Sequence, residues 1–136
     1  MPADFAVLVA TAWIGMLIGI SFIATPVKFR VTSLTRPIAL EVGRMTFHVF
    51  SRIEWLLAAL LLGAEAMANG AAWRWPIAAL AAAIVFLQSI WLLPALDRRV
   101  AGVISGETLA PSYAHQVYGA LEGLKLLALI AAGFAH

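Results

Sequence analysis

The chain has 136 residues, of which 63% are hydrophobic and only 12% are charged, and its formal net charge is +2. A soluble protein of this length buries too small a fraction of its surface to hide so many apolar side chains. The absence of cysteine excludes disulfides, thiolate metal sites, iron–sulfur clusters and a cysteine nucleophile. These facts indicate a small membrane protein.

Four apolar stretches approach or exceed the roughly 20 residues that a helix needs to cross a bilayer. They cover about residues 5–25, 46–68, 75–96 and 113–134. We therefore predict an all-α membrane protein with four transmembrane helices in two hairpins, forming one domain. The first stretch is longer than a signal-peptide core and follows no positively charged segment, so we expect a retained span.

Basic residues gather in two of the three predicted connections. Residues 27–44 and 97–112 hold Lys28, Arg30, Arg36, Arg44, Arg98 and Arg99, whereas the middle connection holds only Arg74. The positive-inside rule therefore predicts that loops 27–44 and 97–112 are cytoplasmic and that both termini lie outside. We expect the protein in a bacterial inner membrane.

Two further predictions concern a glycine pair in the first stretch and a glutamate in the second. Gly15 and Gly19 have the G-x-x-x-G spacing, which indicates either a close helix contact or the ordinary glycine content of membrane helices. Glu65 lies near the far end of the second stretch, so we expect its carboxylate to reach the membrane interface.

The two halves of the chain can be overlaid with a shift of 68 residues. This shift places Ser21 on Ser89, Pro26 on Pro94, Arg30 on Arg98, Val49 on Val117 and Glu54 on Glu122. The overlay predicts a tandem two-helix repeat about an axis along the membrane normal. Alternatively, the matches arise because each hairpin needs a helix-ending residue and a positively charged loop. This alternative does not explain the matched glutamates.

Glu54 and Glu122 lie deep within the second and fourth stretches. An ionised carboxylate at such a depth costs at least about 2.5 kcal/mol, so these residues usually face the bundle interior and have a partner. Lys125 is three residues after Glu122 and lies on the same helix face. We predict a Glu122–Lys125 pair, with Glu54 sharing the lysine or bonding to Gln88, Ser89 or a tryptophan N–H.

This polar intramembrane site has two interpretations. It is either a polar clasp that fixes how four apolar helices pack, or a functional site that carries a proton, a cation or a polar substrate. Gln88 and Ser89 on the third stretch can bond across to another helix in either case.

His48 and His115 lie near the same ends of the second and fourth stretches. Two such histidines could be the axial ligands of a b-type haem within a four-helix bundle, with Gly119 leaving room for the porphyrin edge. They are one residue out of the repeat register, and an interfacial histidine can equally be a hydrogen-bonding residue. We expect no metal site, because the E-x-x-H spacing of di-iron bundles is absent.

No enzyme signature is present in the chain. It lacks a Walker motif, a G-x-G-x-x-G after a strand, G-x-S-x-G and H-E-x-x-H. No basic and aromatic surface typical of nucleic-acid binding occurs either. The sequence therefore favours a non-enzymatic protein, and we predict that it binds no nucleic acid.

Short apolar-aromatic motifs resemble those of a known membrane family. S-F-I-A-T-P-V-K-F-R and F-H-V-F in the first half, and W-L-L-P and Q-V-Y-G in the second, resemble the four-span family of the transmembrane protein 205 type. The resemblance implies the four-helix architecture and a connection with membrane trafficking or resistance to toxic compounds. It implies no catalytic residues, and Glu54, Glu122 and Lys125 match no motif of that family.

The leading functional prediction is a non-enzymatic accessory or transport-related component of a homo-oligomer or of a larger membrane assembly. One alternative is a haem b membrane protein, an oxidoreductase or electron carrier that uses His48 and His115. The other is a proton-coupled small transporter that uses Glu54 and Glu122. No cofactor is expected under the leading prediction.

Overall fold

The computed structural model describes residues 1–110 and 113–134, which form four long helices and, within these ranges, no strand. The helical spans are Pro2–Lys28, Arg36–Met67, Arg74–Ile104 and Ala114–Phe134, and all four are long and apolar enough to cross a membrane. The predicted all-α architecture is thus confirmed, and the four helices indicate an integral membrane protein.

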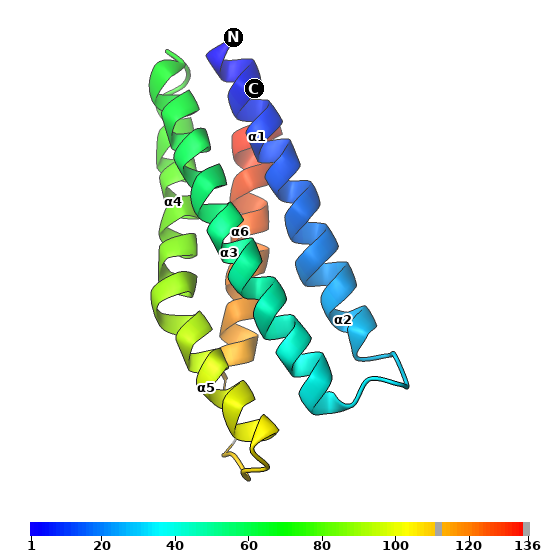
Figure 1. The fold of residues 1–136 in the computed structure, drawn as a ribbon. Coiled ribbons are helices and arrows are strands. Elements are labelled where there is room, and N and C mark those ends of the chain that lie inside the picture. Colours follow the sequence, from blue (N-terminus) through cyan, green and yellow to red (C-terminus); the bar gives the residue numbers. More distant parts are fainter. Residues whose placement is uncertain (111–112, 135–136) are drawn as a thin grey trace.

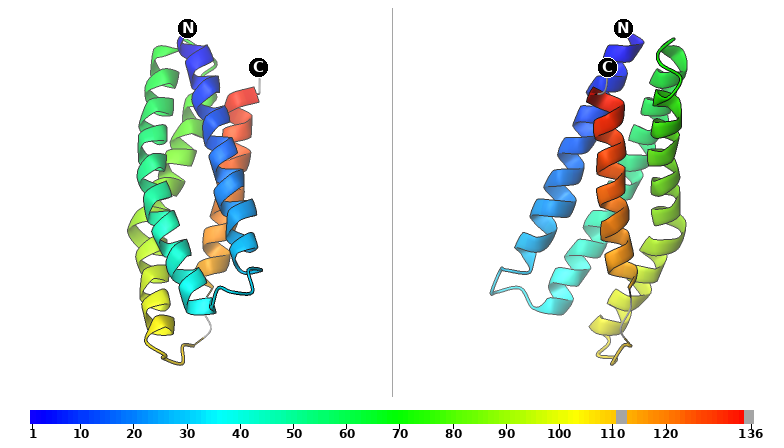
Figure 2. Two further views of the ribbon diagram at one scale, coloured as in Figure 1. Left: turned by 45° about the vertical axis from the view of Figure 1, so that its right-hand side comes forward. Right: turned by 180° about the vertical axis from the view of Figure 1, so that it is seen from behind.

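The helices run alternately up and down, so both termini lie at one end of the bundle (Figure 1). The turn between the second and third spans lies at that same end, and the other two connections lie at the opposite end (Figure 2). Helix α1 (Pro2–Leu17) packs against α3 (Arg36–Met67) and α6 (Ala114–Phe134), and α4 (Arg74–Leu87) packs against the same two. This arrangement places α3 and α6 on one diagonal of the bundle.

The second span begins ten residues earlier than the hydropathy pattern predicts. Thr35 has an extended backbone and precedes Pro37 in the first turn of α3, where a missing N–H costs no hydrogen bond. Residues 36–44, predicted as part of a loop, are therefore helical. The connection itself is short and runs from Phe29 to Thr35.

The third span also continues past its predicted end, as α5 (Leu93–Ile104). It ends in a Schellman motif, in which Gly106 has a φ of 81°. The N–H of Glu107 donates to the carbonyl of Gly102, and the N–H of Gly106 donates to that of Val103. Only glycine adopts this left-handed conformation at no steric cost, so Gly106 fixes the end of the helix.

Spans 1 and 3 each contain a π-helical segment, η1 (Ile18–Ala24) and η2 (Gln88–Leu92). A proline follows two residues after each segment, Pro26 in α2 (Thr25–Lys28) and Pro94 in α5. Proline has no N–H to donate and its ring presses on the preceding turn, which locally widens the helix. The two segments end 68 residues apart, in the register predicted for the repeat.

Two small residues meet where α1 packs against α6. A Cβ built on Gly133 would lie 3.4 Å from the Cβ of Ala10, so the two backbones approach closely there. Gly15 and Gly19 differ, because a Cβ on either would meet nothing within 4 Å. The G-x-x-x-G pair therefore makes no close contact within the described bundle.

Large apolar side chains cover the outside of the bundle. Phe22, Ile23, Trp55, Phe86 and Trp91 are between 43% and 56% exposed. The interior instead holds a continuous cluster that includes Trp13, Leu17, Phe50, Leu61 and Leu129. An apolar exterior of this kind is suited to lipid rather than to water, in keeping with a position in the bilayer.

Candidate functional site

Lys125 is the centre of a polar cluster in the middle of the bundle. Its Nζ lies 2.5 Å from Glu54 Oε1, 2.6 Å from Glu122 Oε1 and 2.7 Å from Gln88 Oε1. The lysine is 0% exposed and both glutamates are 1% exposed. An ammonium group has three donors, and this one directs them to three acceptors on three different side chains.

The remaining members of this Glu54–Lys125–Glu122 cluster support the two carboxylates. Gln88 Nε2 donates to Glu122 Oε1 at 2.8 Å, and the hydroxyl of Ser21 donates to Glu122 Oε2 at 2.5 Å. The indole N–H of Trp13 donates to Glu54 Oε1 at 3.0 Å. Buried charges are tolerated when they are paired and hydrogen-bonded in this way.

Every span contributes to the cluster. Trp13 and Ser21 come from the first span, Glu54 from α3, Gln88 from the third span, and Glu122 with Lys125 from α6. The cluster also joins α3 to α6 across the diagonal of the bundle. Removal of one partner from such a buried network leaves an uncompensated charge, which is why it fixes the mutual position of the helices.

The structure brings together four of the five predicted polar residues. Glu54, Glu122, Lys125 and Gln88 meet, but Ser89 does not join them. Its hydroxyl lies 2.8 Å from that of Ser51 and accepts the indole N–H of Trp55 at 3.1 Å. Ser89 is the neighbour of Gln88 and therefore projects from another face of the helix, toward α3.

The sequence predicts a tryptophan N–H as one possible partner of Glu54, and the structure identifies that tryptophan as Trp13. A tryptophan in a membrane helix is most often an interfacial residue, and only the rotation of α1 against α3 reveals that Trp13 faces Glu54. Ser21 was recognised through its repeat partner Ser89, but its bond to Glu122 was not. A full search for donors near the middle of each span would have found both residues.

A second buried ion pair joins the end of α3 to the start of α4. Glu65 Oε1 lies 3.1 Å from Arg74 Nη2, and both residues are buried. Glu65 Oε1 has no hydrogen-bond donor among the described residues, so charge alone holds this contact. Arg74 Nη2 donates its hydrogen bond to the carbonyl of Ala132 at 2.9 Å, which ties α4 to the end of α6.

The two histidines have different surroundings. His48 Nε2 lies 2.6 Å from Asp97 Oδ2, which links α3 to α5. His115 is exposed and lines a cavity that His48 does not line. His48 Nε2 therefore faces Asp97, and haem ligation by His48 and His115 stays a prediction. In residues 1–110 and 113–134 no group of three or more His, Cys, Asp or Glu could hold a metal ion.

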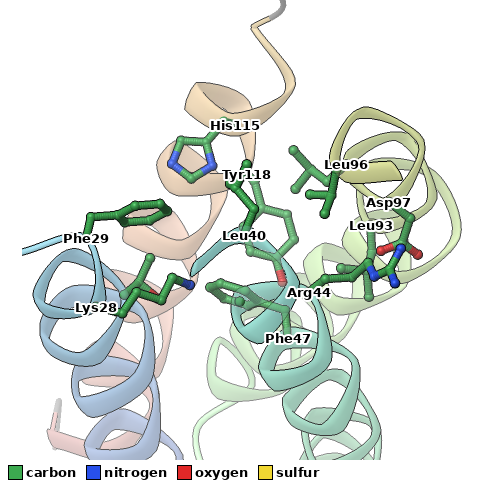
Figure 3. Close-up of a pocket in the computed structure, with 13 residues that line it drawn as sticks. Lys28, Phe29, Leu40, Arg44, Phe47, Leu93, Leu96, Asp97, His115 and Tyr118 are labelled. Atoms are coloured by element: carbon green, nitrogen blue, oxygen red, sulfur yellow. The ribbon is translucent and has the colours of Figure 1, made fainter. Parts of the chain in front are cut away.

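The cavity lies at the end of the bundle that carries the two basic connections (Figure 3). It has a volume of about 90 Å³, and its lining includes Lys28, Arg44, Phe47, Asp97, His115 and Tyr118. We call it the basic cavity. Tyr118 is buried and packs edge-on against Phe47 with ring centroids 5.3 Å apart. Since Tyr118 lies one helical turn before Glu122, this residue separates the basic cavity from the polar cluster.

A family model matches most of the chain. Searches of curated proteins and of solved structures found no significant similarity. A family model described as a domain of unknown function, DUF4149, matches residues 8–102, a region that holds Trp13, Glu54 and Gln88 but ends before Glu122 and Lys125. The matched region exceeds half of the sequence, and the chain therefore belongs to the DUF4149 family of unknown function.

Proposed function

We propose that the protein is a non-enzymatic membrane component, an accessory or transport-related subunit that acts within a homo-oligomer or a larger membrane assembly. The observation that carries the proposal is the self-contained polar cluster. Side chains from all four spans satisfy one another around Lys125. A bundle fixed in this way presents a rigid outer surface to lipid and to other membrane proteins.

The apolar exterior supports the same proposal. Aromatic side chains such as Trp55, Phe86 and Trp91 are about half exposed on the outside, where they can contact either lipid or another chain. Gly15 and Gly19 leave open space beside the first span, which a neighbouring helix could approach closely. The resemblance to the transmembrane protein 205 type, with its connection to trafficking or resistance to toxic compounds, belongs to this proposal as well.

The test is the mass of the protein after extraction in a mild detergent. Native mass spectrometry should reveal a complex of two or more chains, or a copurified membrane protein. A titration with additional detergent is the control, because chance occupancy of one micelle falls with dilution and a specific complex persists. A monomer without any partner under all these conditions would contradict the proposal.

The second candidate is a proton-coupled transporter, and the charge of the cluster favours it. Two carboxylates share a single ammonium group. If both acids are ionised, one negative charge is not balanced, and the cluster can take up one proton. Tyr118, one helical turn before Glu122, lines the basic cavity. Intramembrane carboxylates with such surroundings commonly form proton relays.

Proton flux into liposomes that contain the purified protein tests this second candidate. Glu54→Gln and Glu122→Gln should abolish a flux that the unmodified protein supports. Glu107→Gln is the matched control, because Glu107 is an exposed residue outside the cluster. Normal flux in the Glu54→Gln/Glu122→Gln double variant would leave the cluster with a structural role alone.

The haem alternative is tested by the absorption spectrum. Protein produced with an adequate haem supply should show a Soret band that His48→Ala and His115→Ala each change, if these residues are axial ligands. A spectrum without that band removes this alternative.

A further inference from the structure

We propose that the basic cavity and its outward continuation bind the headgroup of an anionic phospholipid, one that carries a hydroxyl donor beside its phosphate. This inference does not depend on the proposed function, because it concerns a different part of the bundle. It rests on the charge, the apolar walls and one unpaired buried oxygen at this end of the molecule.

The basic cavity continues into a larger groove at the same end of the bundle. The groove has a volume of about 430 Å³ and shares Phe29, Leu40 and His115 with the basic cavity. Arg36 and Arg99 line it as well. Its volume lies within the roughly 300–1,000 Å³ that is typical of small-molecule sites.

Positive charge predominates around both spaces. Lys28 and Arg44 line the inner space, and Arg36 and Arg99 line the outer one. No carboxylate of the described residues forms an ion pair with Lys28 or Arg44, although Asp97 lines the same cavity. The Lys28 ammonium instead lies 5.2 Å and 5.9 Å from the ring centroids of Phe29 and Phe47.

Asp97 adds an acceptor to this basic site. Its Oδ2 is 2.6 Å from His48 Nε2, whereas its Oδ1 is buried and has no hydrogen-bond partner among the described residues. A buried acceptor without a donor is costly. A headgroup hydroxyl would supply the donor, while the phosphate of the same headgroup would face Lys28 and Arg44.

The walls of the two spaces suit the rest of a lipid molecule. Phe29, Leu40 and Leu96 line both spaces, and Val103 lines the outer one. Figure 3 shows Phe29 and Leu96 on opposite sides, with the Lys28 amino group directed between them. Basic pockets between membrane helices on the cytoplasmic side are known to take anionic headgroups, and the basic connections place this end of the bundle there.

The experiment measures lipid retained by the intact protein in native mass spectra. The probes are short-chain phosphatidylglycerol, phosphatidylcholine of equal chain length, and inorganic phosphate. Phosphatidylglycerol should bind about tenfold or more tightly than phosphatidylcholine, because each basic residue contributes to the attraction of an anionic lipid. Inorganic phosphate should not displace it.

Matched charge variants separate this site from a general surface effect. Lys28→Gln/Arg44→Gln should weaken phosphatidylglycerol binding about tenfold to thirtyfold. Arg52→Gln/Arg98→Gln removes the same charge from two exposed arginines that line neither space and should leave binding within about twofold.

Three outcomes would overturn the proposal. They are equal affinity for the two lipids, displacement by inorganic phosphate, and an equal loss in both double variants. Should Lys28→Gln/Arg44→Gln fail to fold, Lys28→Gln alone against Arg52→Gln provides the same comparison.

Discussion

At the scale of single residues, Glu54, Gln88, Glu122 and Lys125 are polar side chains inside an otherwise largely apolar bundle, and all four are paired with one another. The lysine of the central cluster, Lys125, satisfies two glutamates that would each be costly alone in a membrane. Its position three residues after Glu122 made half of this arrangement predictable from the sequence. The contact between Lys125 and Glu54 also requires α3 and α6 to be diagonal neighbours. That arrangement depends on how the loops and helices pack.

Trp13→Phe tests the hydrogen bond that supports Glu54. The change removes the indole N–H that lies 3.0 Å from Glu54 Oε1 while it keeps an aromatic ring in the core. We expect a loss of about 2 kcal/mol in the free energy of unfolding, since a hydrogen bond to a charged group contributes about 1.5–3 kcal/mol. Denaturant titration in detergent micelles measures this loss.

The control for that change is Trp91→Phe. Trp91 is 56% exposed on the outside of the bundle, so its replacement should alter the free energy of unfolding by no more than about 0.5 kcal/mol. Equal effects of the two substitutions would show that the Trp13–Glu54 bond contributes nothing particular.

At the scale of elements, the four helices were predictable but their ends were not. Hydropathy identifies the part of each helix that suits lipid, and α3 and α5 continue beyond it with segments that contain arginine residues. Pro37 lies in the first turn of α3, a position that proline suits but that hydropathy does not identify. Hydropathy likewise cannot predict the π-helical segments before Pro26 and Pro94, because these segments are defined by backbone hydrogen bonds.

The connections between the helices allow a direct test of orientation. The chain has no cysteine, so Ser33→Cys and Asn69→Cys each introduce a single thiol, one at either end of the bundle. The positive-inside rule predicts that Asn69→Cys reacts with an impermeant maleimide on intact spheroplasts, whereas Ser33→Cys reacts only after lysis. The opposite pattern of labelling would reverse the proposed orientation.

At the scale of the whole molecule, the central cluster unites four helices whose outer faces are apolar. Apolar side chains gain little from meeting each other rather than lipid, so packing and polar contacts must hold such a bundle together. The Glu54–Lys125–Glu122 cluster meets this need with side chains from all four spans. A second contact, between Glu65 and Arg74, holds the end of the bundle that carries the termini.

The central claim is that Lys125 holds the bundle together by neutralising buried carboxylates. The most direct test compares the free energies of unfolding of Lys125→Met and Glu54→Gln. Lys125→Met leaves two buried acids without a cation and should lose about 3–5 kcal/mol. Glu54→Gln retains the balanced Glu122–Lys125 pair and should lose at most about 2 kcal/mol.

Lys28→Met is the matched control for this comparison, because Lys28 is only partly buried and lies outside the cluster. It should unfold within about 1 kcal/mol of the unmodified protein. The predicted order of stability is therefore Lys28→Met, then Glu54→Gln, then Lys125→Met as the least stable variant. Unfolding of Lys125→Met at the same denaturant concentration as the unmodified protein would contradict the account.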